Sequence, residues 1–108
     1  MRVIPREELL KILREVKRKL KEILGDDLVE VILFGSYARG EAREGSDVDV
    51  LVVVKRWPSM EELDRIGDLS AELTLKYGVL FSLLPYVETP SMESDPLIWN
   101  VEAEGVEI

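Results

Sequence analysis

The sequence predicts an α/β (α+β) fold in which helices pack on a small mixed β-sheet, and three observations support this prediction. Two long stretches, 5–24 and about 59–77, repeat apolar residues at three- and four-residue steps, which is typical of helices with one buried face. Short runs rich in valine and leucine separate them, as expected of strands. The two patterns alternate without repeats or linkers, so we expect one domain over 1–108.

Both predicted long helices carry recognisable end signals. Pro5 suits the first turn of the first helix, and Gly25 suits its end. Ser59 opens the second helix with a capping box that reaches Glu62, and Gly78 closes it. The lysines and arginines on the outer side of the first helix are interpreted as a solvated face.

Three strands are predicted, at 28–34, 47–54 and 79–84, the last interrupted at Pro85. The continuous Val/Leu run of the second strand indicates a central position, covered on both faces. The remaining segments are expected as a short helical stretch at 35–44, a loop at 88–96, a short helix at 97–104 and a terminal strand at 105–108. Trp57 and Pro58 are expected to cap the core, and Trp99 to pack in the tail or, alternatively, to face a partner.

Composition excludes several classes of site. Cysteine and histidine are both absent, so disulfides, thiolate metal sites and imidazole catalysis are excluded. The 22 acidic and 14 basic residues give a net charge of −8, which argues against stable nucleic-acid binding. No stretch approaches the ~20 apolar residues of a membrane span, and the charged N-terminus after Arg2 is unlike a signal peptide. We therefore expect a cytoplasmic protein without membrane contact; the lack of glutamine is typical of a thermophile.

The residues with chemical character gather where the first predicted strand ends. Gly35 lets the backbone approach a ligand closely. Ser36 adds a hydroxyl at the start of a short helical stretch, whose free amides suit an anionic phosphate. Taken alone, such a Gly-Ser pair is more often an ordinary turn.

Asp47 and Asp49 make the site more specific. Residues two apart on a strand project to one face, and their Cα atoms lie roughly 6.5 Å apart, so both carboxylates can converge on a hard cation. The alternative is a polar strand entry in which Ser46 and Asp47 form a turn, and the pair alone does not decide. Beside a phosphate turn, however, the pair predicts a metal bridging carboxylates to a triphosphate, as in phosphoryl or nucleotidyl transfer.

The pair Gly35-Ser36, followed after ten residues by Asp-Val-Asp ending at Asp49, resembles the signature of the DNA-polymerase-beta-like nucleotidyltransferase superfamily. The fuller string GSYARGEAREGSDVDVLVVV is similar to its minimal nucleotidyltransferase (MNT) branch, small chains often encoded beside a HEPN-domain protein. The resemblance implies the nucleotidyltransferase fold, with Gly35 and Ser36 holding the β and γ phosphates. It implies that Asp47 and Asp49 are the catalytic ligands of Mg²⁺, two ions when nucleotide is bound, and that Arg39 steadies the phosphates or the turn.

The resemblance also implies a function. The chain is expected to bind ATP or another nucleoside triphosphate with Mg²⁺ and to transfer a nucleotidyl group to a hydroxyl of a protein partner. That partner is expected to be a HEPN-domain toxin, which makes this chain the antitoxin. The alternative is a catalytically weak or inactive module that binds a nucleotide or its partner and neutralises the partner by contact.

One departure from the family pattern separates these two hypotheses. The pattern places a third carboxylate on the next long strand, but residues 79–84 contain no acid. Ser82 is the only polar residue of that stretch, so it is the best match to the missing position and is expected to face the same side as the aspartates. Glu88, the nearest acid downstream, can be up to ~20 Å from Ser82 in an extended chain, and we do not expect it to substitute.

Overall fold

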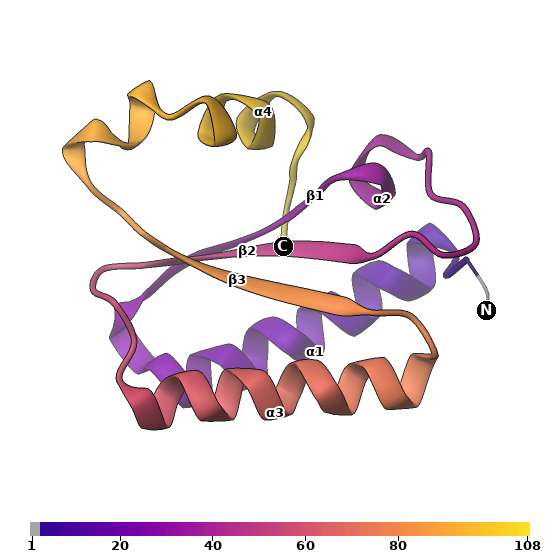
Figure 1. The fold of residues 1–108 in the computed structure, drawn as a ribbon, viewed down its shortest axis with the longest axis horizontal. Coiled ribbons are helices and arrows are strands. Elements are labelled where there is room, and N and C mark those ends of the chain that lie inside the picture. The colour runs from indigo at the N-terminus through magenta and orange to yellow at the C-terminus, as the bar shows by residue number, and fades with distance from the viewer. Residues whose placement is uncertain (1–2) are drawn as a thin grey trace.

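The computed structural model describes residues 3–108 as a four-stranded mixed sheet with helices on both faces (Figure 1). Met1 and Arg2, on which the expectation about the N-terminus rests, lie outside the described residues. The strands are β1 (Leu28–Phe34), β2 (Val48–Val54), β3 (Phe81–Val87) and β4 (Val106–Glu107). The α-helices are α1 (Arg6–Leu24), α2 (Ser36–Arg39), α3 (Met60–Tyr77) and α4 (Pro96–Glu104), with 3₁₀ turns at Gly25–Asp27 and Pro90–Ser94. The predicted fold class is confirmed.

The strand order in the sheet is β3-β2-β1-β4. β1 runs antiparallel to both β2 and β4, whereas β2 and β3 are parallel. The central position predicted for the Val/Leu-rich strand is confirmed, because Val50 and Val52 are buried in one cluster and Leu51 and Val53 in another.

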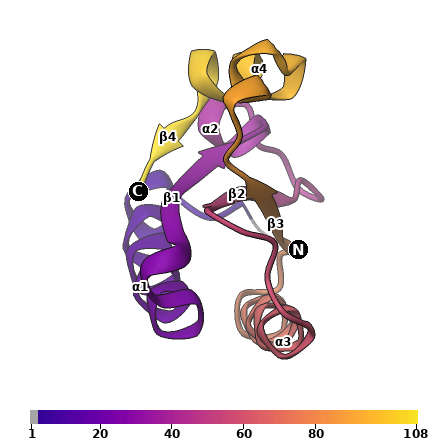
Figure 2. The same cartoon turned by 90° about the vertical axis from the view of Figure 1, so that its left-hand side faces the viewer.

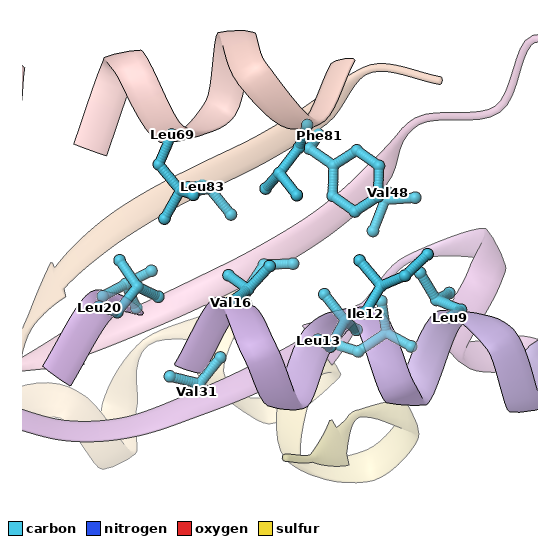
Figure 3. Close-up of a cluster of buried hydrophobic side chains, with 14 of the residues drawn as sticks. Leu9, Ile12, Leu13, Val16, Leu20, Val31, Val48, Leu69, Phe81 and Leu83 are labelled. Carbon is cyan, nitrogen blue, oxygen red and sulfur yellow. The ribbon is translucent and has the colours of Figure 1, made fainter. Parts of the chain in front are cut away.

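The larger core lies between the sheet and the two long helices. Figure 2 shows α1 and α3 side by side beneath one face of the sheet. Figure 3 shows side chains of α1, among them Val16 and Leu20, meeting side chains of the strands. Phe81 of β3 is fully buried in this cluster and packs against Tyr77, with ring centroids 5.8 Å apart. This face therefore holds most of the apolar contact that stabilises the fold.

The other face of the sheet carries α4 and the 3₁₀ turn that precedes it (Figure 1). Its cluster consists of Ile98 and Val101 from α4 packed on Ile32, Leu51 and Val53. The Tyr86 hydroxyl donates a 2.6 Å hydrogen bond to Asp95, the residue that caps α4. At the other end, a Cβ on Gly105 would lie 2.2 Å from the Val101 carbonyl oxygen, so only glycine lets the chain turn from α4 into β4.

The helix predictions hold to within a residue or two. α1 begins at Arg6, one residue later than expected, so that Pro5 is its N-cap, and it ends before Gly25. The capping box of α3 is present, with Ser59 and Glu62 exchanging side-chain and backbone hydrogen bonds. The helical stretch expected over 35–44 is only the single turn of α2.

The prediction that the third strand is interrupted at Pro85 is wrong, because β3 continues to Val87. β3 is an edge strand, and only one side of it bonds to β2. The Leu80 carbonyl accepts from Val48, and the Glu88 amide donates to Val54, so the even-numbered residues bond inward. Position 85 therefore turns its backbone to the free edge, where proline loses no ladder hydrogen bond.

The expectation for the tryptophans is corrected in part. Pro58 is buried, but Trp57 is 57% exposed and does not cap the core. Trp99 is 60% exposed, and its indole N–H donates to the Glu93 carbonyl oxygen. Within residues 3–108, no helix combines the length and apolar character that crossing a membrane requires.

Candidate active site

The Gly-Ser turn lies directly after β1, and the short helix α2 that follows it is bonded to Ile4 and to Arg6 of α1. Gly35 has a φ of +77°, a conformation that favours glycine, and it is the N-cap of α2. The Tyr37 hydroxyl accepts a 3.3 Å hydrogen bond from the Ile4 amide inside the core. Arg6 of α1 donates to the Ala38 carbonyl oxygen at 3.4 Å. These contacts fix the turn. The Ala38 and Arg39 amides both donate to the Gly35 carbonyl oxygen, which leaves the amides of Ser36 and Tyr37 at the start of α2 as the candidates for a phosphate.

Gly35 and Asp49 are brought together by the pairing of β1 with β2. The register places Phe34 opposite Asp49, so the turn that follows Phe34 lies beside this carboxylate. A Cβ built on Gly35 would lie 2.6 Å from Asp49 Oδ2, closer than real Cβ atoms come. The missing side chain at position 35 therefore makes room for the carboxylate at position 49.

The two aspartates differ in their surroundings. β2 begins at Val48, so Asp47 lies one residue before the strand rather than in it. Asp47 is exposed and Asp49 is half-buried. Burial raises the pKa of the Asp49 carboxyl above its usual value, and the neighbouring charge of Asp47 raises that pKa further. Two carboxylates that repel each other in this way form a site that a cation would stabilise.

Ser82 lies where the sequence predicts. In the parallel pairing of β2 with β3 it is the direct partner of Asp49, and neighbouring strands lie about 4.8 Å apart. Because side chains alternate along each strand, Ser82 and Asp49 share a face, so this geometric expectation is confirmed. Residues 3–108 contain no group of three acidic side chains able to hold a metal. The Glu88 amide bonds to Val54, at the opposite end of β2 from Asp49.

Arg39 forms ion pairs that the sequence did not predict. Its guanidinium forms ion pairs with Glu41 and with Glu104 of α4, both at 3.2 Å. These two carboxylates, Glu41 first, raise the pKa of the Arg39 guanidinium. Glu104 is 65 residues further along the chain, so no local pattern could have predicted the contact. The pair links the end of α2 to the end of α4.

Asp49 is only half-buried because α4 covers only part of its face of the sheet. Along β2, Leu51 and Val53 lie under α4 and are at most 1% exposed. Asp49 lies two residues before Leu51 on the same face of β2, and α4 does not bury it. The arrangement can hold a hydrated cation between two carboxylates, beside the amides of Ser36 and Tyr37 at the start of α2.

A family described as a nucleotidyltransferase domain matches residues 11–97, which include every candidate site residue. The chain belongs to this nucleotidyltransferase family. A candidate protein adenylyltransferase of Methanocaldococcus jannaschii is 43% identical over 101 residues, covering 94% of this chain and 99% of that relative. Protein adenylyltransferase MntA of Thermococcus cleftensis is 39% identical over 83 residues, covering 70% of this chain and 82% of MntA. The resemblance to the MNT branch is confirmed.

Solved structures share the fold of this nucleotidyltransferase. One described as a candidate minimal nucleotidyltransferase is 28% identical with a TM-score of 0.57, covering 92% of this chain and 95% of its own. A toxin–antitoxin structure with AMP-PNP is 19% identical with a TM-score of 0.57, covering 96% of this chain and 72% of that one. A Shewanella oneidensis complex of a tri-AMPylated HEPN toxin with an MNT antitoxin is 17% identical with a TM-score of 0.53, covering 90% of this chain and 69% of the matched chain. At these identities, the two complexes show a common fold alone.

Proposed function

We propose that this chain, as one domain, is a protein adenylyltransferase that binds ATP with Mg²⁺ and transfers AMP to a hydroxyl of a HEPN-domain protein. The observation that carries the proposal is the close approach of the Asp49 carboxylate to Gly35. It joins the candidate metal ligand to the candidate phosphate turn. The names of the relatives, protein adenylyltransferases, support AMP as the group transferred.

The residues present fit Mg²⁺. This cation takes carboxylate, phosphate and water oxygens, and it is commonly held by one or two carboxylates together with substrate phosphates. Asp47 and Asp49 supply such a pair, and the raised pKa of Asp49 reflects a carboxylate whose negative charge is poorly compensated without a cation. When bound, Mg²⁺ would supply positive charge that offsets the negative charge of the carboxylates and of the phosphates.

The chain's own residues orient the substrate. The Gly35-Ser36 turn holds the terminal phosphates through backbone amides and the serine hydroxyl. Asp47 and Asp49 would hold the cation at the start of β2, and the cation would offset the negative charge of the phosphates there. The acceptor oxygen then forms a bond to the α-phosphorus, the bond from that phosphorus to the bridging oxygen breaks, and pyrophosphate leaves with the electron pair. The hydroxyl proton passes to water, because the neutral hydroxyl of Ser82 is not a base.

The partner is proposed from the known complexes. The Shewanella oneidensis complex contains a HEPN toxin that carries AMP groups together with an MNT antitoxin. By analogy, the acceptor of this chain would be a hydroxyl side chain of a HEPN toxin, and transfer would be the antitoxin activity. The open face beside Asp49 leaves room for such an acceptor.

A second candidate function rests on Ser82. A neutral hydroxyl opposite Asp49 leaves the site with two carboxylates instead of three. Loss of the third carboxylate weakens activation of the acceptor more than nucleotide binding. In this alternative, the chain binds Mg-ATP or the HEPN protein and neutralises its partner by contact.

The test combines binding and transfer. Titration calorimetry with ATP, with and without Mg²⁺, is expected to show Mg²⁺-dependent binding. Incubation with labelled ATP, Mg²⁺ and the proposed HEPN partner is expected to place label on that partner. Binding without label would favour the second function. Undetectable binding at millimolar ATP under both conditions would eliminate the nucleotide site.

A further inference from the structure

A groove on the outer side of α1 gathers positive charge on a chain that is acidic as a whole. It has a volume of about 530 Å³, and Leu28 and Val29 of β1 form its apolar part. The rest of the lining of this basic groove is charged, with four cations and one acid: Arg14, Lys17, Arg18, Lys21 and Glu22. Because the net charge of the chain is −8, the groove is a local reversal of sign, which suits a negatively charged surface.

The positive charge of the basic groove is only partly balanced within the chain. Arg18 is paired with Glu15 and Glu22. Lys21 lies 3.7 Å from an aspartate whose side chain is fully exposed, and such a pair contributes little. Within residues 3–108, Arg14 forms no ion pair and no side-chain hydrogen bond. The groove therefore has cationic side chains that can pair with another surface.

Negative charge gathers in a second concavity, which we call the acidic hollow. It has a volume of about 220 Å³ and is lined by carboxylates from three elements, Glu30 of β1, Glu102 of α4 and Glu107 of β4. Burial raises the pKa of the Glu30 carboxyl above its usual value, and the charges of Glu107 and Glu102 raise that pKa further. None of the three carboxylates pairs with a lysine or arginine of residues 3–108. Carboxylates that repel one another in this way are stabilised when cationic side chains approach.

The basic groove and the acidic hollow lie on opposite sides of one edge of the sheet, the edge formed by β1 and β4. Leu28 of the groove packs against the larger core, whereas Ile32 of the hollow packs under α4. Figure 2 shows α1 and α4 on either side of this edge. The Lys17 ammonium donates a 2.6 Å hydrogen bond to the Ile108 backbone oxygen, which ties α1 to the end of β4. The two charged surfaces therefore belong to one side of the molecule.

We propose that a second copy of this chain covers this edge, so that the basic groove of each copy faces the acidic hollow of the other. A two-fold axis that runs along the strands beside the edge exchanges its two sides and creates two identical contacts. Each contact sets the cations of one groove against the three carboxylates of one hollow. The dimer leaves the candidate active site free, because Leu28 and Val29 lie at the opposite end of β1 from Phe34, which pairs with Asp49.

The charge pattern favours a second copy over a nucleic acid. A nucleic acid would be attracted by the basic groove but repelled by the carboxylates on the same edge, whereas a second copy satisfies both surfaces at once. The net charge of −8 on each copy opposes association. At about 0.15 M salt, however, exposed charges more than about 8 Å apart are largely screened, and pairs that become partly buried are screened much less. Association is therefore expected to depend on the charges at the edge.

Sedimentation velocity of the full chain over a concentration series, at about 0.15 M salt, tests the proposal. The unaltered chain is expected to form a dimer. A groove variant is expected to weaken dimerisation at least about tenfold, because it sets like charges against each other at both contacts. Its three substitutions are Arg14→Glu, Lys17→Glu and Lys21→Glu. Its melting temperature shows whether it is folded. If it is not, the glutamine substitutions at the same three positions replace it, and these are expected to weaken the dimer as well.

A hollow variant makes the test specific to the two surfaces. Its substitutions are Glu30→Lys, Glu102→Lys and Glu107→Lys, and alone it is also expected to dimerise at least about tenfold more weakly. An equimolar mixture of the groove and hollow variants is expected to form a dimer again, because opposite charges then meet at both contacts. Each substitution changes the net charge of −8 by two units, so both variants remain negative. Attraction between opposite net charges therefore cannot produce this rescue.

The control makes three charge reversals of the same kind at exposed positions away from the edge. These are Lys55→Glu, Arg65→Glu and Lys76→Glu, and they are expected to leave the dimer unchanged. A monomeric unaltered chain at every concentration overturns the proposal, as does a dimer that persists in both the groove and the hollow variants. A mixture of the two variants that stays monomeric overturns it as well. Binding of a nucleic acid to the groove of a monomeric chain would assign the groove to that ligand instead.

The outcomes are independent of the proposed function. The groove variant is expected to bind Mg-ATP with unchanged affinity, because the groove lies at the far end of β1 from the aspartates. A dimer that the charge exchange breaks and restores, in a chain that does not bind ATP, supports this inference while the proposed function fails. Mg²⁺-dependent ATP binding by a chain that stays monomeric supports the nucleotide site and overturns this inference alone.

Discussion

The two faces of the sheet differ in how completely they are covered, and the difference separates stability from chemistry. Beneath one face, α1 and α3 lie side by side and bury Val50, Val52 and Phe81 (Figure 2). On the other face, α4 covers Leu51 and Val53 but leaves Asp49 and Ser82 half-buried. Alternate residues of β2 therefore serve different purposes. Val50 and Val52 pack in the larger core, whereas Asp49, on the opposite face, is a candidate metal ligand.

This division explains how so small a chain tolerates a charged site. The burial of Asp49 and its repulsion by Asp47 are costs that lie on the less covered face. The large apolar contacts that offset these costs lie on the closed face, within the same strands. Substitutions on the face under α1 and α3 should therefore change the stability of the fold, and substitutions at the aspartates should change ATP binding.

The largest expected effect is a loss of stability from a substitution on the face of the sheet that α1 and α3 cover. Phe81→Ala is expected to lower the free energy of unfolding by about 3–5 kcal/mol, because the side chain is fully buried and packs on Tyr77. Denaturant unfolding measures it. The matched change on the open face of the same strand, Leu84→Ala, is expected to cost no more than about 0.5 kcal/mol. Similar losses from the two variants would contradict the comparison.

The second prediction concerns the open face. Asp47→Ala with Asp49→Ala is expected to abolish Mg²⁺-dependent ATP binding by calorimetry, because both carboxylate ligands are removed. The melting temperature without metal is expected to stay the same or rise slightly, since burial and mutual repulsion make the Asp49 charge unfavourable. The control Asp64→Ala with Asp68→Ala removes equal charge from α3 and should leave binding intact. A large fall in melting temperature in the first variant would mean that the aspartates are structural.

The third prediction sharpens the role of Ser82. Ser82→Asp is expected to raise the rate of AMP transfer to the HEPN protein by at least about tenfold, because it places a base opposite Asp49. Its effect on ATP affinity should be smaller, since two carboxylates and the phosphates already hold the cation. Ser94→Asp, on the exposed 3₁₀ turn before α4, adds the same charge elsewhere as the control.

Brisk transfer by the unaltered chain, with no gain from Ser82→Asp, would contradict this assignment. Some other acid, from this chain or from its partner, would then complete the site. Slow transfer that the aspartate accelerates would instead explain why position 82 matters, because the unaltered chain would be limited by activation of the acceptor.

Much of the fold and the centre of the site could be predicted from local sequence. The capping box at Ser59 and the apolar periodicity give α3, and the Val/Leu run gives β2, because these signals depend on neighbouring residues. The spacing from Gly35 to Asp49 predicted residues that the β1–β2 register does bring together. Ser82 opposite Asp49 followed from strand alternation once the two strands were assumed to be neighbours.

The features that could not be predicted depend on non-local geometry. Whether Pro85 breaks a strand depends on which edge its backbone faces, and this is fixed only by the pairing of β3 with β2. The exposure of Trp57 follows from how the chain leaves β2, not from its apolar character. The ion pair of Arg39 with Glu104 joins residues 65 apart, and no periodicity encodes it.

The smallest expected effect is a change in ATP affinity when the ion pair of Arg39 with Glu104, which joins α2 to α4, is broken. The family resemblance implies that Arg39 steadies the phosphates or the turn, and its guanidinium is paired with Glu41 and with Glu104 of α4. A triphosphate must compete with these carboxylates for the guanidinium. Glu104→Gln removes one competitor, so we expect Mg-ATP affinity to rise about two- to fivefold, the range for one exposed ion pair.

The control for this change is Glu102→Gln, which removes the same charge from the same helix without touching the Arg39 pair. It should leave affinity nearly unchanged, so a gain specific to Glu104 cannot come from reduced net negative charge. The gain should shrink as salt is raised, because exposed charges are screened over about 8 Å at physiological ionic strength. Unchanged or weaker ATP binding in Glu104→Gln would mean that Arg39 does not reach the phosphates and serves only to hold α4 against α2.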